Sequence, residues 1–249
     1  MPQRREYPNP PILEGLVQFS FAQPIPWNVA TPGRVFERLR EAYPTEPETQ
    51  GMLQAAFNPQ PTGGAVADFT LTHGNQRVVY KDETQTRLLV LNDRMFSINS
   101  LRPYEGWDSL AERMTDGLRA LRDVMTVPTI NEVSVRYINQ IPVPRGQRTE
   151  DYFRYEIHTV RSGASYLRNF VHRVESLLPD RVTTAGTTFA SAQPESEDMF
   201  TILLDIEFKR VLGEGVSVED AFTEVLELKQ LENAEFESVI TNQTRELFS

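Results

Sequence analysis

The sequence contains no cysteine and no long run of apolar residues. The first absence excludes disulfides and thiolate chemistry, and it fits a reducing compartment. The second excludes a membrane-spanning helix, which needs about 20 consecutive apolar residues. Residues 1–11 are polar and rich in proline, so they lack the apolar run of a secretory signal. We therefore expect a cytoplasmic protein that does not enter membranes.

Familiar catalytic motifs are also missing. The chain has no phosphate-binding loop, no Gly-x-Gly-x-x-Gly segment and no Gly-x-Ser-x-Gly elbow. Its three histidines, His73, His158 and His172, do not show the spacing of a metal site. The sequence thus predicts no cofactor, no metal and no catalytic residue of a known type. An enzyme of unknown class stays open as an alternative.

The acidic residues are unevenly distributed along the chain. The net charge is −10, and residues 195–249 hold 14 acidic and 4 basic side chains, whereas the other residues hold 21 of each. An acidic surface repels nucleic-acid phosphates, so the C-terminal segment disfavours nucleic-acid binding on that face. The alternative is that these charges line the solvated face of a helix.

Apolar residues follow the period of strands in some segments and of helices in others. A composition of 39% apolar and 24% charged residues is typical of a globular chain with a core. The pattern predicts an α+β fold, in which antiparallel sheets pack against helices. We expect strands in residues 12–21, 51–101, 133–143 and 187–209, a turn at residues 73–76, helices that begin at Thr31, Ser109 and Ser217, and a break in the last helix near Asn233.

The order of these elements repeats weakly along the chain. A strand, a proline pair, a helix, further strands and a long helix occur in residues 16–125 and again in residues 133–248. One architecture that this order predicts is two pseudo-repeated β-α-β(n)-α lobes, an N-terminal lobe of residues 1–128 and a C-terminal lobe of residues 129–249 with an acidic helical end. The alternatives are a single continuous domain, a duplication without present symmetry, or coincidence.

Polar residues inside two predicted strands are candidates for a structural polar core. Arg136 and Asn139 interrupt an apolar strand, and their odd separation places them on opposite faces. Asp205 and Glu207 share one face of another strand, where paired carboxylates could act as acid and base or could hold Mg²⁺. We favour a structural role for Arg136, Asn139 and Asp205, with Arg136 paired to Asp205, because a buried charge needs a partner.

Residues 145–181 are rich in arginine, with aromatic residues interleaved. That composition is typical of protein interfaces and also of surfaces that bind nucleic acids, although acidic residues dilute it here. The third interpretation is an ordinary surface. As binding residues of an interface we select Arg148, Tyr152, Arg154, Arg161, Tyr166 and Arg168.

Five segments, in order along nearly the whole chain, carry a resemblance to a protein family. They are Asn-Pro-Pro-Ile-Leu-Glu at residues 9–14, Asn-Ser-Leu-Arg-Pro-Tyr-Glu-Gly-Trp at 99–107, Val-Arg-Tyr-Ile-Asn-Gln-Ile at 135–141, Ile-Leu-Leu-Asp-Ile at 202–206, and Phe-Glu-Ser-Val-Ile-Thr at 236–241 followed by Phe248. The chain resembles a sporadically distributed bacterial and archaeal family of uncharacterised proteins of about this length. One departure is that residues 228–232 lack the Leu-His pair that is frequent in the family.

The resemblance implies no catalytic or binding residues, because none are assigned in the family. Sporadic distribution implies, by association, an accessory role such as defence against phage. Together with the arginine-rich segment and the acidic end, this favours a non-enzymatic interaction or assembly subunit of a bacterial accessory system, which binds a protein partner or associates with itself. A nucleic-acid-binding accessory protein is the first alternative, and an enzyme of unknown class is the second.

Overall fold

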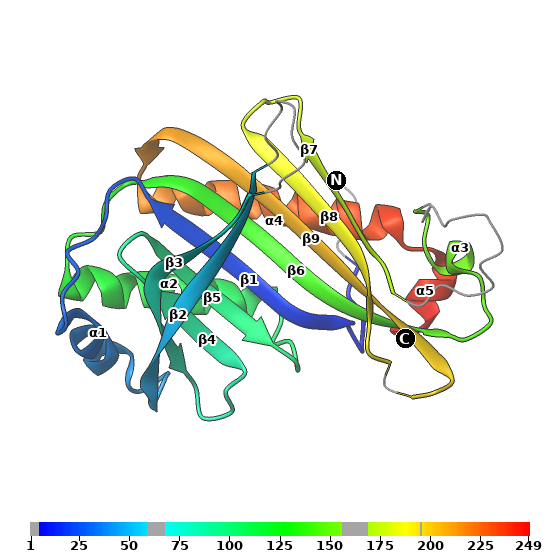
Figure 1. Ribbon diagram of the computed structural model, residues 1–249. Coiled ribbons are helices and arrows are strands. Elements are labelled where there is room, and N and C mark those ends of the chain that lie inside the picture. Colours follow the sequence, from blue (N-terminus) through cyan, green and yellow to red (C-terminus); the bar gives the residue numbers. More distant parts are fainter. Residues whose placement is uncertain (1–4, 59–67, 156–168, 195) are drawn as a thin grey trace.

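The protein is built around one antiparallel sheet (Figure 1). The structure is a computed structural model that describes residues 5–58, 68–155, 169–194 and 196–249. Within these ranges nine strands lie in the order β2-β3-β4-β5-β1-β6-β9-β8-β7. The strands are β1 (Ile12–Phe21), β2 (Thr45–Asn58), β3 (Asp68–Lys81), β4 (Arg87–Leu91), β5 (Met95–Leu101), β6 (Ile130–Pro144), β7 (Val171–Leu177), β8 (Thr183–Ala192) and β9 (Met199–Val216). The α+β prediction is confirmed.

β1 lies in the middle of the sheet, because it pairs with β5 on one side and with β6 on the other. The alternation that predicted this strand also distinguishes its two faces. Val17, Phe19 and Phe21 are buried, whereas Leu16 and Gln18 on the other face are half-buried. The β1–β6 pair therefore joins residues 1–128 and 129–249 into one continuous sheet.

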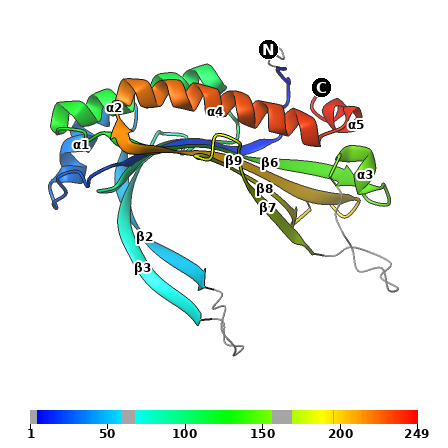
Figure 2. The ribbon, with the colours of Figure 1, turned by 90° about the horizontal axis from the view of Figure 1, so that it is seen from above.

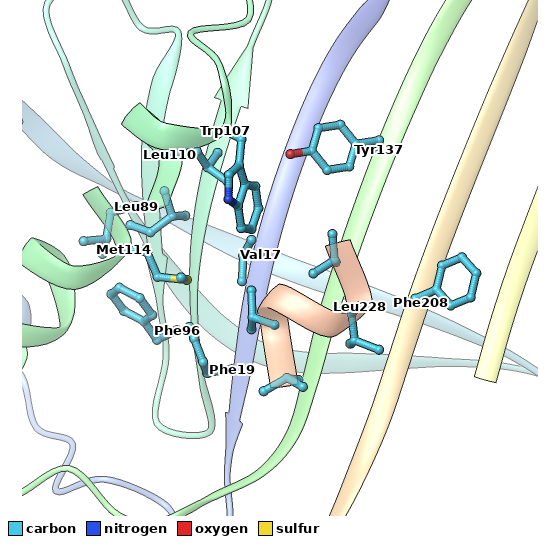
Figure 3. Packing of buried hydrophobic residues seen from close by; sticks show 14 of the residues in the cluster. Val17, Phe19, Leu89, Phe96, Trp107, Leu110, Met114, Tyr137, Phe208 and Leu228 are labelled. Carbon is cyan, nitrogen blue, oxygen red and sulfur yellow. The ribbon is translucent and has the colours of Figure 1, made fainter. Parts of the chain in front are cut away.

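The two longest helices, α2 (Trp107–Val124) and α4 (Val218–Val239), form a layer on one face of the sheet (Figure 2). The other helices of the described ranges are α1 (Thr31–Leu39), α3 (Thr149–Tyr152) and α5 (Asn242–Glu246). α2 packs on β5, and α4 packs on β6 and β9. Side chains such as Phe19, Phe96, Met114 and Leu228 fill the space between helices and sheet (Figure 3). No helix in the described ranges is long and apolar enough to cross a bilayer.

The ends of the long helices differ in how well the sequence predicts them. Ser217 caps α4 as expected, since its Oγ accepts a hydrogen bond of 3.1 Å from the amide of Asp220. The expected break near Asn233 is wrong, because buried residues continue along one face of α4 on both sides of it. α2 begins at Trp107 rather than with Ser109 as its cap, because Ser109 donates its hydroxyl hydrogen to Glu105 instead.

One expected turn does not occur, and one strand accommodates two prolines at its end. β3 runs through residues 73–76, where Gly74 pairs with Met52 beside a shift of register, so a bulge takes the place of a turn. β6 continues past Pro142 to Pro144, both paired with β9. This is possible because β1 pairs with β6 only as far as Asn139, so no neighbour needs the amide hydrogens that the prolines lack.

Candidate functional site

The sheet face opposite the helices is covered by no helix of the described ranges, and it is curved, with β2 and β3 bending away from the helix layer (Figure 2). On this concave face lies a hollow of ≈ 460 Å³. Its lining combines apolar side chains with polar side chains. The lining residues are Glu14, Leu16, Gln50, Arg77, Val79, Lys81, Gln85, Leu88, Val90, Asn99, Leu101 and Arg136.

The strand pairing explains why these residues converge. In β1 the face that carries Glu14 and Leu16 is the one turned away from the buried side chains. In β4 the same alternation separates Leu88, which lines the hollow, from the core residue Leu89. Because neighbouring strands are in register, residues of six adjacent strands, β2 to β5, β1 and β6, reach one surface.

Hydrogen bonds hold the polar side chains of the hollow in place. The Asn99 amide donates to Glu14 Oε1 at 2.6 Å and accepts from Ser97 Oγ at 2.9 Å. Arg77 donates from Nε and Nη2 to Gln50 Oε1 at 3.3 and 3.1 Å. These bonds order the side chains before any ligand arrives, which reduces the entropy lost on binding.

An ion pair lies at the β2 side of the hollow. Lys81 Nζ donates to Glu48 Oε1 at 2.6 Å, and this hydrogen bond lowers the pKa of Glu48. Glu48 is therefore ionised at neutral pH, and it balances the charge of Lys81.

The structure brings Arg136 and Asp205 together in a bidentate pair. Nε and Nη2 of Arg136 lie 2.8 and 2.7 Å from the two carboxylate oxygens of Asp205. This hydrogen bonding raises the pKa of Arg136 further above its usual value, so the guanidinium stays charged. The pair lies on the concave face and not in the core, with side chains 36% and 14% exposed. Asn139 does lie in the core, on the opposite face, where its amide donates to the carbonyl of Leu204 at 3.2 Å.

Glu207 lies on the same face as Asp205, as the alternation of β9 predicts. Its Oε2 is 3.7 Å from Arg173 Nη2, which reaches across β8 from β7. Gly186 of β8 leaves the room for this crossing, since a Cβ there would lie 3.0 Å from Arg173 Nη2. A second hollow of ≈ 110 Å³ lies at this point of the face, between Arg173, Glu175, Glu207 and Lys209. Asp205 and Glu207 of β9 therefore each lie beside an arginine.

The predicted arginine-rich interface is not assembled in the described part of the chain. Arg148 is exposed, with Nε 3.5 Å from Glu150, and Arg154 is exposed as well. The prediction that Tyr152 belongs to a surface is wrong, because its ring is buried in the core. The remaining candidates, Arg161, Tyr166 and Arg168, lie outside the described residues.

Many acids of the C-terminal segment have basic partners. Arg210 of β9 pairs with Glu224 and Glu227 of α4. Arg245 of α5 pairs with Glu237. The acidic end is therefore partly an internal network that joins α4 to its neighbours, and less of it is available to a partner than its charge suggests.

Sequence reasoning missed most residues of the larger hollow. The period of two places Arg77, Val79 and Lys81 on one face of β3, and Leu88 and Val90 on one face of β4. Val79 and Val90 are as apolar and as buried as their neighbours, so no local signal distinguishes this face from the core face. Within the described ranges, no group of three or more acidic or histidine side chains is placed to hold a metal ion.

Residues from the resembling segments meet near the centre of the sheet. Glu14 binds Asn99, and the hydroxyls of Tyr104 and Tyr137 lie 2.8 Å apart. Tyr137 in turn packs over Gly15, where an added Cβ would lie 2.6 Å from its ring. These contacts join β1, β5 and β6. No family model matches the chain, and no curated protein matches it.

Arg136→Ala should destabilise the fold without selectively abolishing a binding function. The substitution removes two hydrogen bonds to a carboxylate, and after allowance for exposure we expect a loss of about 1–2 kcal/mol in the free energy of unfolding. Chemical denaturation measures this loss. The control is Arg148→Ala, whose side chain is 76% exposed and whose replacement should change stability by less than about 0.5 kcal/mol. An Arg136→Ala protein with an unchanged melting temperature and lost binding would contradict the structural role.

Proposed function

We propose that this protein is a non-enzymatic interaction subunit whose concave sheet face binds a partner protein. The observation that carries the proposal is the amphipathic hollow on the face that no described helix covers. Its apolar side chains, among them Leu16, Leu88 and Leu101, lie beside ordered polar groups. Apolar contact area bordered by satisfied polar groups is the usual composition of a protein interface.

The charge of the hollow favours a protein over a nucleic acid. Its three cations are Arg77, Lys81 and Arg136, and three acids lie among or against them, namely Glu14, Glu48 and Asp205. The surface is thus balanced in charge. Nucleic-acid binding depends on an excess of positive charge that displaces counterions from the phosphates, and this face does not supply one.

The carboxylates on this face favour binding over acid–base catalysis. Asp205 accepts two hydrogen bonds from Arg136, and Glu207 lies near Arg173. Both carboxylate oxygens of Asp205 are therefore occupied by a guanidinium instead of being open to a substrate. The role of these ion pairs is then to keep the charged side chains of the face in place beside its apolar contact area.

We also propose that the two halves of the chain are pseudo-repeats. In each half the first strand lies beside the last, as β1 lies beside β5 and β6 lies beside β9. In each half a long helix follows the last strand and lies on the same face of the sheet, α2 in the first half and α4 in the second (Figure 2). We propose further that the partner belongs to a bacterial accessory system, such as one for defence against phage. This part of the proposal is supported by the family resemblance alone.

The test is affinity capture of the tagged full chain from its native host, with and without nuclease, followed by mass spectrometry. Leu88→Glu places a charge in the hollow, where Leu88 is half-buried. Leu226→Glu is the matched control, because Leu226 is 46% exposed on α4, in the helix layer. We expect to capture a partner protein in stoichiometric amount, and nuclease treatment should not reduce its recovery. The Leu226→Glu variant should recover the same amount of this partner, whereas Leu88→Glu should recover at least about tenfold less.

Two results would contradict the proposal. One is recovery of nucleic acid, or of proteins that are lost on nuclease treatment. The other is equal capture by Leu88→Glu and Leu226→Glu, which would place the binding surface elsewhere. Circular dichroism and melting temperature of both variants show that each is folded, so that loss of capture is not a loss of structure.

A further inference from the structure

β7 is an edge strand with unusual exposure. It pairs with β8 on one side, and no other strand of the described ranges lies on its outer side. Six of its seven residues are exposed, and the exception is His172, whose Nδ1 lies 2.7 Å from the Tyr155 hydroxyl. Val171 and Leu177 are 76% and 62% exposed. A long exposed edge with apolar residues is a surface on which another strand can pair.

The pairing with β8 determines which backbone groups of β7 face outward. Just beyond the two ends of the strand, the carbonyl of Phe170 accepts from the amide of Ser191, and the amide of Leu178 donates to the carbonyl of Thr183. Even-numbered residues of this strand therefore direct their amides and carbonyls toward β8. Those of Val171, Arg173, Glu175 and Leu177 point to the open edge, because antiparallel ladders alternate in this way.

The sequence of β7 is complementary to its own reverse. With Val174 as the centre, Arg173 corresponds to Glu175, and Val171 corresponds to Leu177. Two copies that run antiparallel with Val174 opposite Val174 would place Arg173 opposite Glu175 twice. The same register places Val171 opposite Leu177 twice and aligns the outward-facing backbone groups of both strands. Opposite charges and apolar pairs across an antiparallel ladder stabilise it.

We propose that a second copy of this chain binds β7, so that two sheets join edge to edge about a two-fold axis at Val174. A two-fold interface must be complementary to itself, and β7 meets that requirement. The neighbouring registers are unfavourable. Centring the pair on Arg173 places two arginines opposite each other, and centring it on Glu175 places two glutamates opposite each other. Shifting the register by one residue places residues whose backbone groups point to the open edge opposite residues whose groups point toward β8. The hydrogen bonds between the two β7 strands are then lost.

This interface is distinct from the larger hollow of the concave face, whose lining residues come from β1 to β6 and the β3–β4 turn. Pairing at β7 would leave the larger hollow of each copy open and would hold these two hollows on one extended sheet. The two proposals can therefore fail separately. The dimer is measured on purified protein without any partner, and Leu88→Glu should leave it unchanged.

The experiment is sedimentation equilibrium of the purified full chain and of two charge variants. In Arg173→Glu both charges of β7 are negative, and in Glu175→Arg both are positive. Each variant alone should raise the dimer Kd by at least about tenfold, because like charges then face each other twice. An equimolar mixture of the two should form a heterodimer with a Kd near that of the parent chain, because each negative side chain again faces a positive one.

Recovery in the mixture separates the interface from a folding defect, since a misfolded variant would not regain affinity from its counterpart. The swap variant, Arg173→Glu combined with Glu175→Arg, should also dimerise like the parent. A parent chain that stays monomeric at 100 μM, about the upper end of a weak dimer, would overturn the proposal. A dimer that neither charge variant weakens, or that mixing does not restore, would overturn it as well.

Discussion

Replacing Lys229 with methionine should lower the free energy of unfolding by about 3–5 kcal/mol. Lys229 Nζ lies 2.6 Å from Glu232 Oε2 on α4, and the two side chains are only 11% and 4% exposed. The ammonium also lies 3.5 Å from the ring centroid of Tyr137. Removing this cation leaves the carboxylate of Glu232 buried without the charge that offsets its desolvation. Urea denaturation of the variant and the parent chain, followed by circular dichroism, measures the difference.

The double variant Lys229→Met with Glu232→Leu should recover most of that loss, because it removes both buried charges and keeps apolar volume. Arg119→Met is the matched control. Arg119 and Asp116 form a pair of the same spacing on α2, but their side chains are 69% and 58% exposed, so the change should be below about 1 kcal/mol. If the double variant is as unstable as Lys229→Met, the lysine contributes through its aliphatic stem and not through the pair.

Replacing Gly117 with leucine should cost about 3 kcal/mol or more of stability. Gly117 lies in α2 where the helix meets β4 and β5, and an added Cβ would lie 2.8 Å from Phe96 Cζ and 2.9 Å from Leu89 Cδ1. Both neighbours are buried in the core (Figure 3), so neither can move into solvent. Gly117→Ala should cost less, about 1 kcal/mol, because alanine regains helix propensity while its methyl group meets the same contacts.

The control for this position is Thr115→Leu, two residues away on the exposed side of α2. It should change stability by less than about 0.5 kcal/mol, since leucine is a good helix former and meets no core atom there. Thermal unfolding of the three variants under identical conditions gives the comparison. Equal melting temperatures for Gly117→Leu and Thr115→Leu would mean that α2 can move away from the sheet at no cost.

Elements with a strong local pattern were predictable. β1 has the predicted bounds because apolar residues alternate with polar ones from Val17 to Phe21 and prolines follow it. Strands were also predicted in residues 187–209, where β8 and β9 lie, although both strands extend beyond that range. Local patterns suffice here because each residue of these strands faces either the core or the open face.

Elements whose extent depends on a neighbour were not predictable. Pro142 ends a strand in most contexts, yet in β6 it pairs with Thr201 because β1 has already ended beside it. Nothing local to Pro142 shows how far β1 extends. The same applies to residues 73–76, where pairing with β2 overrides the preference of Gly74 and Asn75 for turns.

The candidate site also has one feature that the sequence predicts locally and others that depend on distant strands. The pairing of Arg136 with Asp205 could be inferred, because two opposite charges in apolar strands need partners. Its location on the open face could not, since that depends on which side of the sheet the helices cover. The hollow draws on residues from Glu14 to Arg136, and only the order of strands across the sheet and its curvature bring them together.

The central position of β1 has a consequence for synthesis on the ribosome. Translation produces β1 first, and residues 130–144, which form β6, emerge only after all the strands of the first half. Until then the nascent chain can pair β1 with β5 but must leave the other side of β1 as an edge, with Val17, Phe19 and Phe21 in that strand. Such an edge is prone to aggregate. One side of β1 therefore stays unpaired until β6 is made, and pairing with β6 ends the exposure of that edge.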